Sequence, residues 1–496
     1  MKKRRVPGRT DRVVVVGAGL GGLSAALRLA GAGREVTVLE RGAAPGGRAG
    51  SLTVAGFTFD TGPTVLTMPG LIEDALACVG ENLPDWLDLL PLSPAYRAHY
   101  ADGSTLDVHA DVEAMAAEVA RVCGAAEAAG YRAFVAFVAE LFRRQYTDFI
   151  DSHADLPGVL RPNLARLVAM GGFRRLSSRV GEFFADERLR RVFSFQAMYA
   201  GVPPDRALAL YAVIAYMDTV AGVYYPRGGV HAVPRALAGA AEKHGVTFRY
   251  GTEVVAVETR GGRAEAVVTA AGERFTADAF VLNPDLPAAY GDLLPARHTP
   301  RRLRRLRSSP SCVVWHVGGA RAYDHLAHHN LLFGEQWDEV FADVMDRKVP
   351  MRDPSLLVTN PTRSDPAAAP AGAQTYYVLA PAPHLGGATD WRARGRAYRD
   401  HLAATLEARG LTGFGGAVVA EHLVTPADWL DQGLAMGTPF SGAHTLLQTG
   451  PFRPGNRVRG LDNVVLAGCG TRPGVGVPMV LLSGRLAAER IIGPVR

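Results

Sequence analysis

The sequence has few cysteines and none of the spacings in which cysteines act as pairs. Among 496 residues there are four, Cys78, Cys123, Cys312 and Cys469, and no two form a CxxC or CxxxxC pattern. Closely spaced cysteine pairs mark disulfide frameworks and redox-active dithiols. We therefore interpret these residues as reduced thiols of an intracellular protein and exclude a dithiol-based reductase.

Long apolar runs are also missing. The best candidate, residues 207–217, contains 11 residues before Asp218, whereas a membrane-spanning helix needs about 20. The opening MKKRR is followed by an apolar stretch, but Gly17, Gly19, Gly21 and Gly22 interrupt it. A secretory signal needs a continuous apolar core, so we expect neither a membrane span nor a signal peptide.

The charge pattern argues against a nucleic-acid partner. The net charge is +6 and the calculated pI is about 9.2, yet no basic stretch is interleaved with aromatic residues as a base-stacking surface requires. Three histidines fall within residues 324–329, but no cysteine or HExxH motif stands near them to complete a zinc site. We expect no metal, and the excess of positive charge favours attraction to anionic lipid.

A glycine-rich turn near the start carries the clearest signal. Residues 12–30 read RVVVVGAGLGGLSAALRLA, in which a valine strand is followed by Gly17, Gly19 and Gly22 and then by leucines at helical spacing. A second strand, residues 36–39, ends in Glu40, 18 residues after the last glycine. This is the GxGxxG pattern of a dinucleotide-binding βαβ unit.

Each part of this pattern has a physical role. Gly17 allows the tight turn, Gly19 lets backbone approach a pyrophosphate, and Gly22 lets the helix pack closely on the strand. The helix N-terminus offers N–H groups and partial positive charge to the phosphates. Glu40 is suited to accept from ribose hydroxyls and would repel a 2′-phosphate, which argues against NADP.

Three further features favour FAD over NAD. The stretch APGGR (44–48) adds a second glycine pair directly after the ribose-binding strand, and FDTGPT (59–64) forms another loop close to where a ring system would lie. Residues 461–491 then read as a strand, a glycine-rich loop and a helix from about Pro478, which would aim its positive end at a reduced flavin. The predicted cofactor-binding residues from these segments are Gly17, Gly19, Gly22, Glu40, Arg41, Gly47, Arg48, Gly62, Pro63, Thr64, Gly468, Thr471, Val477, Pro478 and Met479.

No second GxGxxG follows, because GCGTRPG (468–474) breaks the pattern. A second bound dinucleotide is therefore not indicated. We expect electrons to leave a flavin toward oxygen or a quinone.

With these segments in view, the chain resembles the bacterial phytoene desaturases of the carotenoid-desaturase type, within the wider amine-oxidase-like flavoproteins. The resemblance covers nearly the whole chain. Beyond the shared glycine motifs, it is carried by YPRGGVHAVPRAL (225–237), LAHHNLLFG (326–334), TPADW (425–429) and FRPGNR (452–457). One departure is TRPGVGVPM (471–479), where the family often has THPGAGIPG; it leaves substrate choice and product length open.

The resemblance implies an α/β fold with a three-layer Rossmann-type FAD-binding domain, an interleaved mixed-sheet substrate domain and a helical membrane-facing cap. The FAD-binding domain would comprise 1–80, 220–300 and 425–496, the substrate domain 81–140 and 301–424, and the cap 141–219. Residues 111–220 are indeed helix-like, and 253–283 read as three strands. Family membership also implies that Val254 lies under the adenine.

The implied reaction is desaturation of phytoene to lycopene through phytofluene, zeta-carotene and neurosporene. Hydride would pass to flavin N5 and a proton would leave the neighbouring carbon. A hydrocarbon substrate binds through burial, which fits the aromatic-rich segments 134–142, 193–200, 210–217 and 223–225. Asp148 is the acid/base candidate because it follows an apolar helix, and Arg143 is a weaker one.

A substrate of this kind must leave a bilayer. The stretch RRLRRLR (301–307) and residues 163–184 mix arginine with apolar residues and are suited to lie on anionic lipid. We expect a peripheral protein on the cytoplasmic side of the cell membrane, with a homo-oligomer left open. The alternatives are a carotenoid 3,4-desaturase, a diapocarotenoid desaturase, a ketolase, an amine oxidase, or a flavin-free prenyl-binding protein of the same fold.

Overall fold

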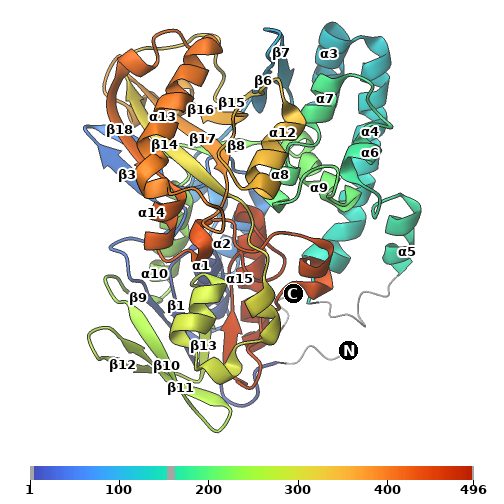
Figure 1. Cartoon of the computed structure of the whole chain (residues 1–496). Coiled ribbons are helices and arrows are strands. Elements are labelled where there is room, and N and C mark those ends of the chain that lie inside the picture. The colour runs from blue at the N-terminus through green and yellow to red at the C-terminus, as the bar shows by residue number, and fades with distance from the viewer. Residues whose placement is uncertain (1–4, 154–161, 494–496) are drawn as a thin grey trace.

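The computed structural model describes residues 5–153 and 162–493. A five-stranded parallel sheet in the order β19-β13-β1-β2-β9 forms its lower half (Figure 1). The strands are β1 (Arg12–Val16), β2 (Glu35–Leu39), β9 (Thr247–Arg249), β13 (Ala279–Leu282) and β19 (Val464–Leu466). They come from the three segments predicted to form the FAD-binding domain.

This sheet is the middle of three layers. One face is covered by α1 (Leu20–Gly31), α2 (Gly70–Ala77), α10 (Ala232–Lys243) and α15 (Val477–Ile492), which share a core with the sheet. The other face carries the antiparallel sheet of β10 (Val254–Arg260), β11 (Arg263–Thr269) and β12 (Arg274–Thr276). A sheet covered on both faces explains why β1 is a continuous valine run.

Residues 253–283 contain four strands, not the three predicted from sequence. The fourth is β13, which leaves the antiparallel sheet and pairs in parallel with β1 and β19. The predicted turn-and-helix elements at both ends of the chain are confirmed, and α15 starts at Val477, one residue before the expected proline.

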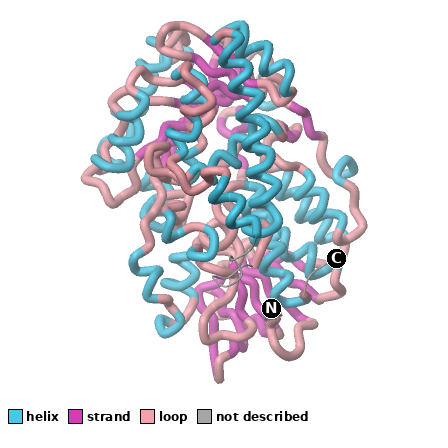
Figure 2. The backbone as a smooth tube through the Cα atoms, turned by 90° about the vertical axis from the view of Figure 1, so that its right-hand side faces the viewer, coloured by secondary structure: helices cyan, strands magenta, loops and turns pink. Residues whose placement is uncertain are grey.

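A second, seven-stranded mixed sheet in the order β18-β14-β17-β16-β15-β6-β7 occupies the upper half. Figure 2 shows the strands of the two sheets as separate groups at the top and bottom. The seven strands are β6 (Tyr96–His99), β7 (Thr105–Val108), β14 (Ser311–Gly319), β15 (His329–Leu332), β16 (Leu356–Thr359), β17 (Gln374–Ala382) and β18 (Val418–Val424), and α12 (Trp337–Phe341), α13 (Trp391–Ala408) and α14 (Pro426–Asp431) accompany them. The remaining strands are the hairpin of β3 (Ser51–Val54) and β4 (Phe57–Asp60) and an antiparallel pair between β5 (Leu89–Pro91) and the sequence-distant β8 (Tyr224–Pro226).

The described residues of the segment 111–220 are mainly helical, as predicted. It holds α3 (Val112–Cys123), α4 (Ala125–Gln145), α5 (Pro162–Ala169), α6 (Leu176–Val180), α7 (Glu187–Val192), α8 (Ala197–Ala200) and α9 (Ala212–Ala215). Two of these helices run on into π-helical turns, Tyr146–Ile150 after α4 and Tyr216–Val220 after α9. Within the described ranges, no helix has the length and apolar character needed to cross a bilayer.

Candidate active site

One cavity of about 1390 Å³ joins the two halves of the molecule. It begins at the β1–α1 turn, passes the start of α15, and continues between the helical segment and the upper sheet. Drug-sized pockets are about 300–1,000 Å³. The larger volume here suits two ligands, one along the glycine turn and one in the apolar remainder.

The β1–α1 turn is built so that only glycine fits. Gly17 has φ +97° and donates its N–H to the Leu39 carbonyl over 2.8 Å. A Cβ on Gly22 would lie 2.1 Å from the Gly17 oxygen. No side chain caps α1 after Gly19, so its first N–H groups are available to an anion at the cavity wall. Gly17 and Gly19 line the cavity, whereas Gly22 supports the turn from within the helix.

Glu40 holds the end of β2 against this turn. Its carboxylate accepts from Ala18 N–H over 2.6 Å and from Gly42 N–H over 2.7 Å. Each carboxylate oxygen keeps a second acceptor site, and Glu40 lines the cavity, so ribose hydroxyls remain suitable donors. Arg41 lines the same wall and is tied to the Gln432 carbonyl.

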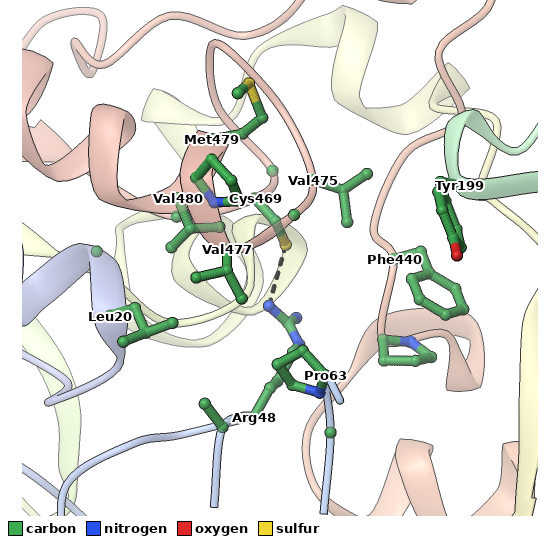
Figure 3. Close-up of a pocket in the computed structure, with 18 of the residues that line it drawn as sticks. Leu20, Arg48, Pro63, Tyr199, Phe440, Cys469, Val475, Val477, Met479 and Val480 are labelled. Carbon is green, nitrogen blue, oxygen red and sulfur yellow. Dashed lines mark hydrogen bonds between the residues drawn. The ribbon is translucent and has the colours of Figure 1, made fainter. Parts of the chain in front are cut away.

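Arg48 links three distant segments beneath the cavity (Figure 3). Its guanidinium donates to the Asp285 carboxylate over 2.9 Å and to the Cys469 sulfur over 3.0 Å. Burial opposes the charge, but Cys469 and Asp285 together raise the pKa of Arg48 above its usual value. Arg48 therefore stays charged and fixes the loops that face a bound ring.

Gly62, Pro63 and Thr64 line the cavity next to Arg48. A Cβ on Gly62 would lie 2.0 Å from the Arg48 carbonyl oxygen, and the Gly62 carbonyl accepts from the Tyr377 hydroxyl over 2.8 Å. The glycine thus permits two chain segments to cross in contact.

The C-terminal loop and helix close the other side. Gly468, Val477, Pro478 and Met479 line the cavity, with Pro478 in the first turn of α15, and Val254 lies at the start of β10 on the same wall. Thr471 is different: the structure does not bring it to the cavity. Its buried hydroxyl bonds to the Gly468 carbonyl over 2.9 Å and to the Ser483 hydroxyl over 2.7 Å.

Arg453 is a component that sequence reasoning missed. It is 1% exposed and donates to the carbonyls of Thr471, Gly442 and Cys469 over 3.1, 3.2 and 2.5 Å. Burial lowers its pKa from the usual value. An arginine in an FRPGNR segment amid glycine loops was the available signal, because a guanidinium can serve several loop carbonyls at once.

The two predicted catalytic residues are not on the cavity wall. Arg143 lies on the exposed side of α4 and pairs with Glu140 over 2.8 Å. Asp148 lies in the π-turn after α4, where its carboxylate accepts from the Asn163 amide over 2.7 Å. Its neighbours Phe149 and Ile150 line the cavity instead. The structure does not bring Arg143 to the site, and it leaves Asp148 beside it.

The apolar lining of the cavity can be divided into two groups of residues, which we call the first and second arms. The first arm comprises Tyr96, Phe195, Tyr199, Met217, Leu331 and Leu357, and the second comprises Leu164, Leu167, Phe173, Leu210, Leu446 and Phe452. Of the predicted aromatic segments, 193–200 and 210–217 contribute to the lining. The segment 134–142 instead packs in the helical core through Phe134, Phe137 and Leu141.

Two of the three histidines of residues 324–329 are held by neighbouring hydroxyls. His328 bonds to Ser364 over 2.8 Å and His329 to Thr359 over 2.9 Å. In the described part of the chain, no three His, Cys, Asp or Glu side chains converge as a metal site would require.

Comparison with known proteins agrees with this geometry. The model for flavin-containing amine oxidoreductases matches residues 20–492. The chain is 58% identical over 493 residues to a phytoene dehydrogenase of Streptomyces griseus, covering 99% of this chain and 96% of that protein. It is 39% identical over 490 residues to a zeta-carotene-forming phytoene desaturase of Myxococcus xanthus, covering 97% and 94%. A solved structure of putrescine oxidase shares the fold, with a TM-score of 0.63 at 16% identity and coverage of 98% and 100%.

Proposed function

The chain belongs to the flavin-containing amine oxidoreductase family and is an FAD-dependent oxidoreductase, and we propose that it desaturates phytoene to lycopene. The observation that carries this proposal is one cavity whose wall combines the glycine turn of a dinucleotide site with a large apolar lining. Its relatives include both zeta-carotene-forming and lycopene-forming phytoene desaturases. The proposal therefore commits to the full series of desaturations predicted from sequence.

The residues present fit FAD. Gly19 and Gly47 meet across the turn, where a Cβ on Gly47 would lie 3.4 Å from the Gly19 Cα, so bare backbone faces the ligand on both sides. Bound FAD supplies the acceptor for hydride. The protein's own contribution is to align the hydrocarbon chain against the ring and to exclude water, which the apolar arms are suited to do.

The decisive test is expression in cells that accumulate phytoene, followed by pigment extraction. We expect lycopene. Accumulation of zeta-carotene would show that the enzyme catalyses only the first desaturations of the proposed series. Unchanged phytoene in cells that hold flavin-loaded enzyme would overturn the proposal in favour of a 3,4-desaturase, a diapocarotenoid desaturase or a ketolase.

We also propose that the second apolar arm opens onto the cytoplasmic face of the cell membrane. Large apolar side chains are exposed around it: Val168 (56%), Phe173 (41%), Leu446 (54%), Leu447 (74%) and Phe452 (38%). Exposed apolar residues at a tunnel mouth are suited to take substrate from lipid. The electron acceptor would then be oxygen or a membrane quinone.

The basic stretch 301–307, which its mixture of arginine and leucine led us to expect on anionic lipid, supports this surface. Its first five residues form a 3-10 helix, Arg301–Arg305, and Leu303 packs inward on the core. Arg307 exchanges hydrogen bonds with Gln448 over 2.7 and 2.9 Å. This backbone contact joins the end of the basic stretch to the residue that follows the exposed Leu446 and Leu447. An arginine close to an anionic lipid surface would add about 1 kcal/mol of attraction.

Replacing both Leu446 and Leu447 by serine tests the membrane surface. Burying a leucine contributes about 1.5–3 kcal/mol, so we expect at least a tenfold loss of binding to vesicles of phosphatidylglycerol and phosphatidylcholine, measured by co-sedimentation. The matched control is Val419→Ser, because Val419 is 59% exposed on β18 of the upper sheet. Equal binding of all three proteins would refute the proposed surface.

A further inference from the structure

Asp218 is a buried acid in the wall of the apolar cavity. It is 3% exposed, and neither carboxyl oxygen has a donor in good hydrogen-bonding geometry, although the Tyr96 hydroxyl and the Gln196 amide lie close enough to oppose the rise in its pKa. It lies in the π-helical turn Tyr216–Val220 and lines the same arm as Tyr199 and Met217. π-turns are often found at functional sites. A carboxyl group buried in the wall of an apolar cavity without a well-formed hydrogen bond is costly, and packing alone does not explain it.

Two phenols and an amide face this carboxyl. Tyr96 from β6 and Tyr199 from α8 are the titratable groups that interact with it, and Gln196 is the neutral one. The Tyr96 hydroxyl is also buried without a geometric hydrogen-bond partner. Tyr199 in turn lies beside Phe440 and across from Val475 of the loop that precedes α15 (Figure 3). The cluster therefore connects the apolar arm to the redox end of the cavity.

We propose that Asp218 is the base that takes the proton released from the hydrocarbon during desaturation. The inference rests on the proposed function, because it assigns a residue to that reaction. It is preferred over Asp148 because Asp218 lines the cavity, whereas Asp148 does not and its carboxylate is engaged by Asn163.

Desaturation removes a hydride from one carbon and a proton from its neighbour. The second C–H bond breaks, its electron pair becomes the new double bond, and the proton forms an O–H bond on Asp218. When oxygen or a quinone later takes the two electrons, it would take two protons with them, the one carried in the hydride and the one on Asp218, and become hydrogen peroxide or a quinol. The carboxylate is then restored for the next turnover.

Burial also makes the Asp218 carboxylate a stronger base, and a stronger base removes a carbon-bound proton more readily. Desolvation raises the pKa of Asp218 well above that of an ordinary aspartate, and contact with Tyr96 and Gln196 opposes the shift. Because the carboxylate is the form that accepts a proton, the reductive rate should rise with pH until Asp218 is ionised. Removing the Tyr96 hydroxyl should move that midpoint to higher pH.

The test is anaerobic mixing of flavin-loaded enzyme with phytoene in vesicles, followed by the loss of flavin absorbance. General bases contribute about 10²–10⁴-fold, so Asp218→Asn should slow flavin reduction at least 100-fold and remove its pH dependence. Tyr96→Phe should keep the rate at high pH and shift the midpoint upward. A second readout is the infrared band of a protonated carboxyl, which we expect in the wild type at neutral pH and not in Asp218→Asn.

The outcomes separate the two proposals. If wild-type flavin is not reduced by phytoene, the proposed function fails. If it is reduced and Asp218→Asn matches the wild type, the assignment of Asp218 fails while the function stands. If flavin reduction is lost in Asp148→Asn and normal in Asp218→Asn, the base is Asp148, and this result also overturns the inference. The flavin spectrum and the unfolding midpoint of each variant show that it is folded and loaded.

Discussion

Replacing Gly22 by alanine is expected to yield a folded protein that lacks flavin. The added Cβ would lie 2.1 Å from the Gly17 carbonyl oxygen, so the β1–α1 turn must open. Opening the turn moves the first N–H groups of α1 away from the pyrophosphate position. We expect flavin affinity to fall at least 100-fold, measured by absorbance of the purified protein and by titration with FAD.

The control for this change is Gly291→Ala. Gly291 is exposed, no atom lies within 4 Å of the position its Cβ would take, and its backbone needs no left-handed conformation. It should purify yellow with normal flavin content. If Gly22→Ala also binds FAD normally, the glycine turn is not the pyrophosphate site and the proposed position of the cofactor is wrong.

The glycine turn could be predicted from sequence because its constraint is local. Gly17 and Gly22 are five residues apart. Gly17 is required by its positive φ, and Gly22 by its contact with the Gly17 carbonyl oxygen, so both reasons lie within the turn. A strand, a turn and a helix leave their period and their glycines in the sequence. The start of α15 was predictable for the same reason, since a proline in a first helical turn is a local signal.

The rest of the site depends on contacts between residues far apart in sequence. Arg48 meets Asp285 and Cys469, which are 237 and 421 positions away. Contacts between residues so far apart leave no periodicity or spacing in the sequence from which they could be predicted. Thr471 was predicted to bind the cofactor because it lies in a glycine-rich loop. Its hydroxyl instead bonds to the Gly468 carbonyl and the Ser483 hydroxyl.

In the helical segment, the sequence also did not predict which side chains point toward the cavity. Apolar periodicity predicted helices across 111–220, and they are present, but it did not tell which apolar face meets the cavity. Phe134 and Phe137 pack in the core, whereas Phe195 and Met217 line the tunnel. Asp218 was seen only as the residue that ends an apolar run, because its significance comes from the cavity it faces.

Replacing Arg453 by methionine is expected to be the most destabilising single change near the site. The guanidinium donates hydrogen bonds to the carbonyls of Thr471, Gly442 and Cys469. Methionine fills similar volume but donates nothing, and each buried carbonyl left without a donor costs about 1–3 kcal/mol. We expect a loss of ~3 kcal/mol or more in the free energy of unfolding in the flavin-free protein, measured by urea denaturation.

The same substitution should also remove bound flavin, because the carbonyls of Cys469 and Thr471 belong to the loop that lines the cavity ahead of α15. Arg453→Lys should lie between wild type and methionine in both measurements, since lysine keeps the charge but cannot reach three divergent carbonyls with a planar fork. Arg394→Met, on the exposed face of α13, should change neither. If Arg453→Met retains both stability and flavin, the loop is held by its own backbone, and the buried guanidinium does not organise the site.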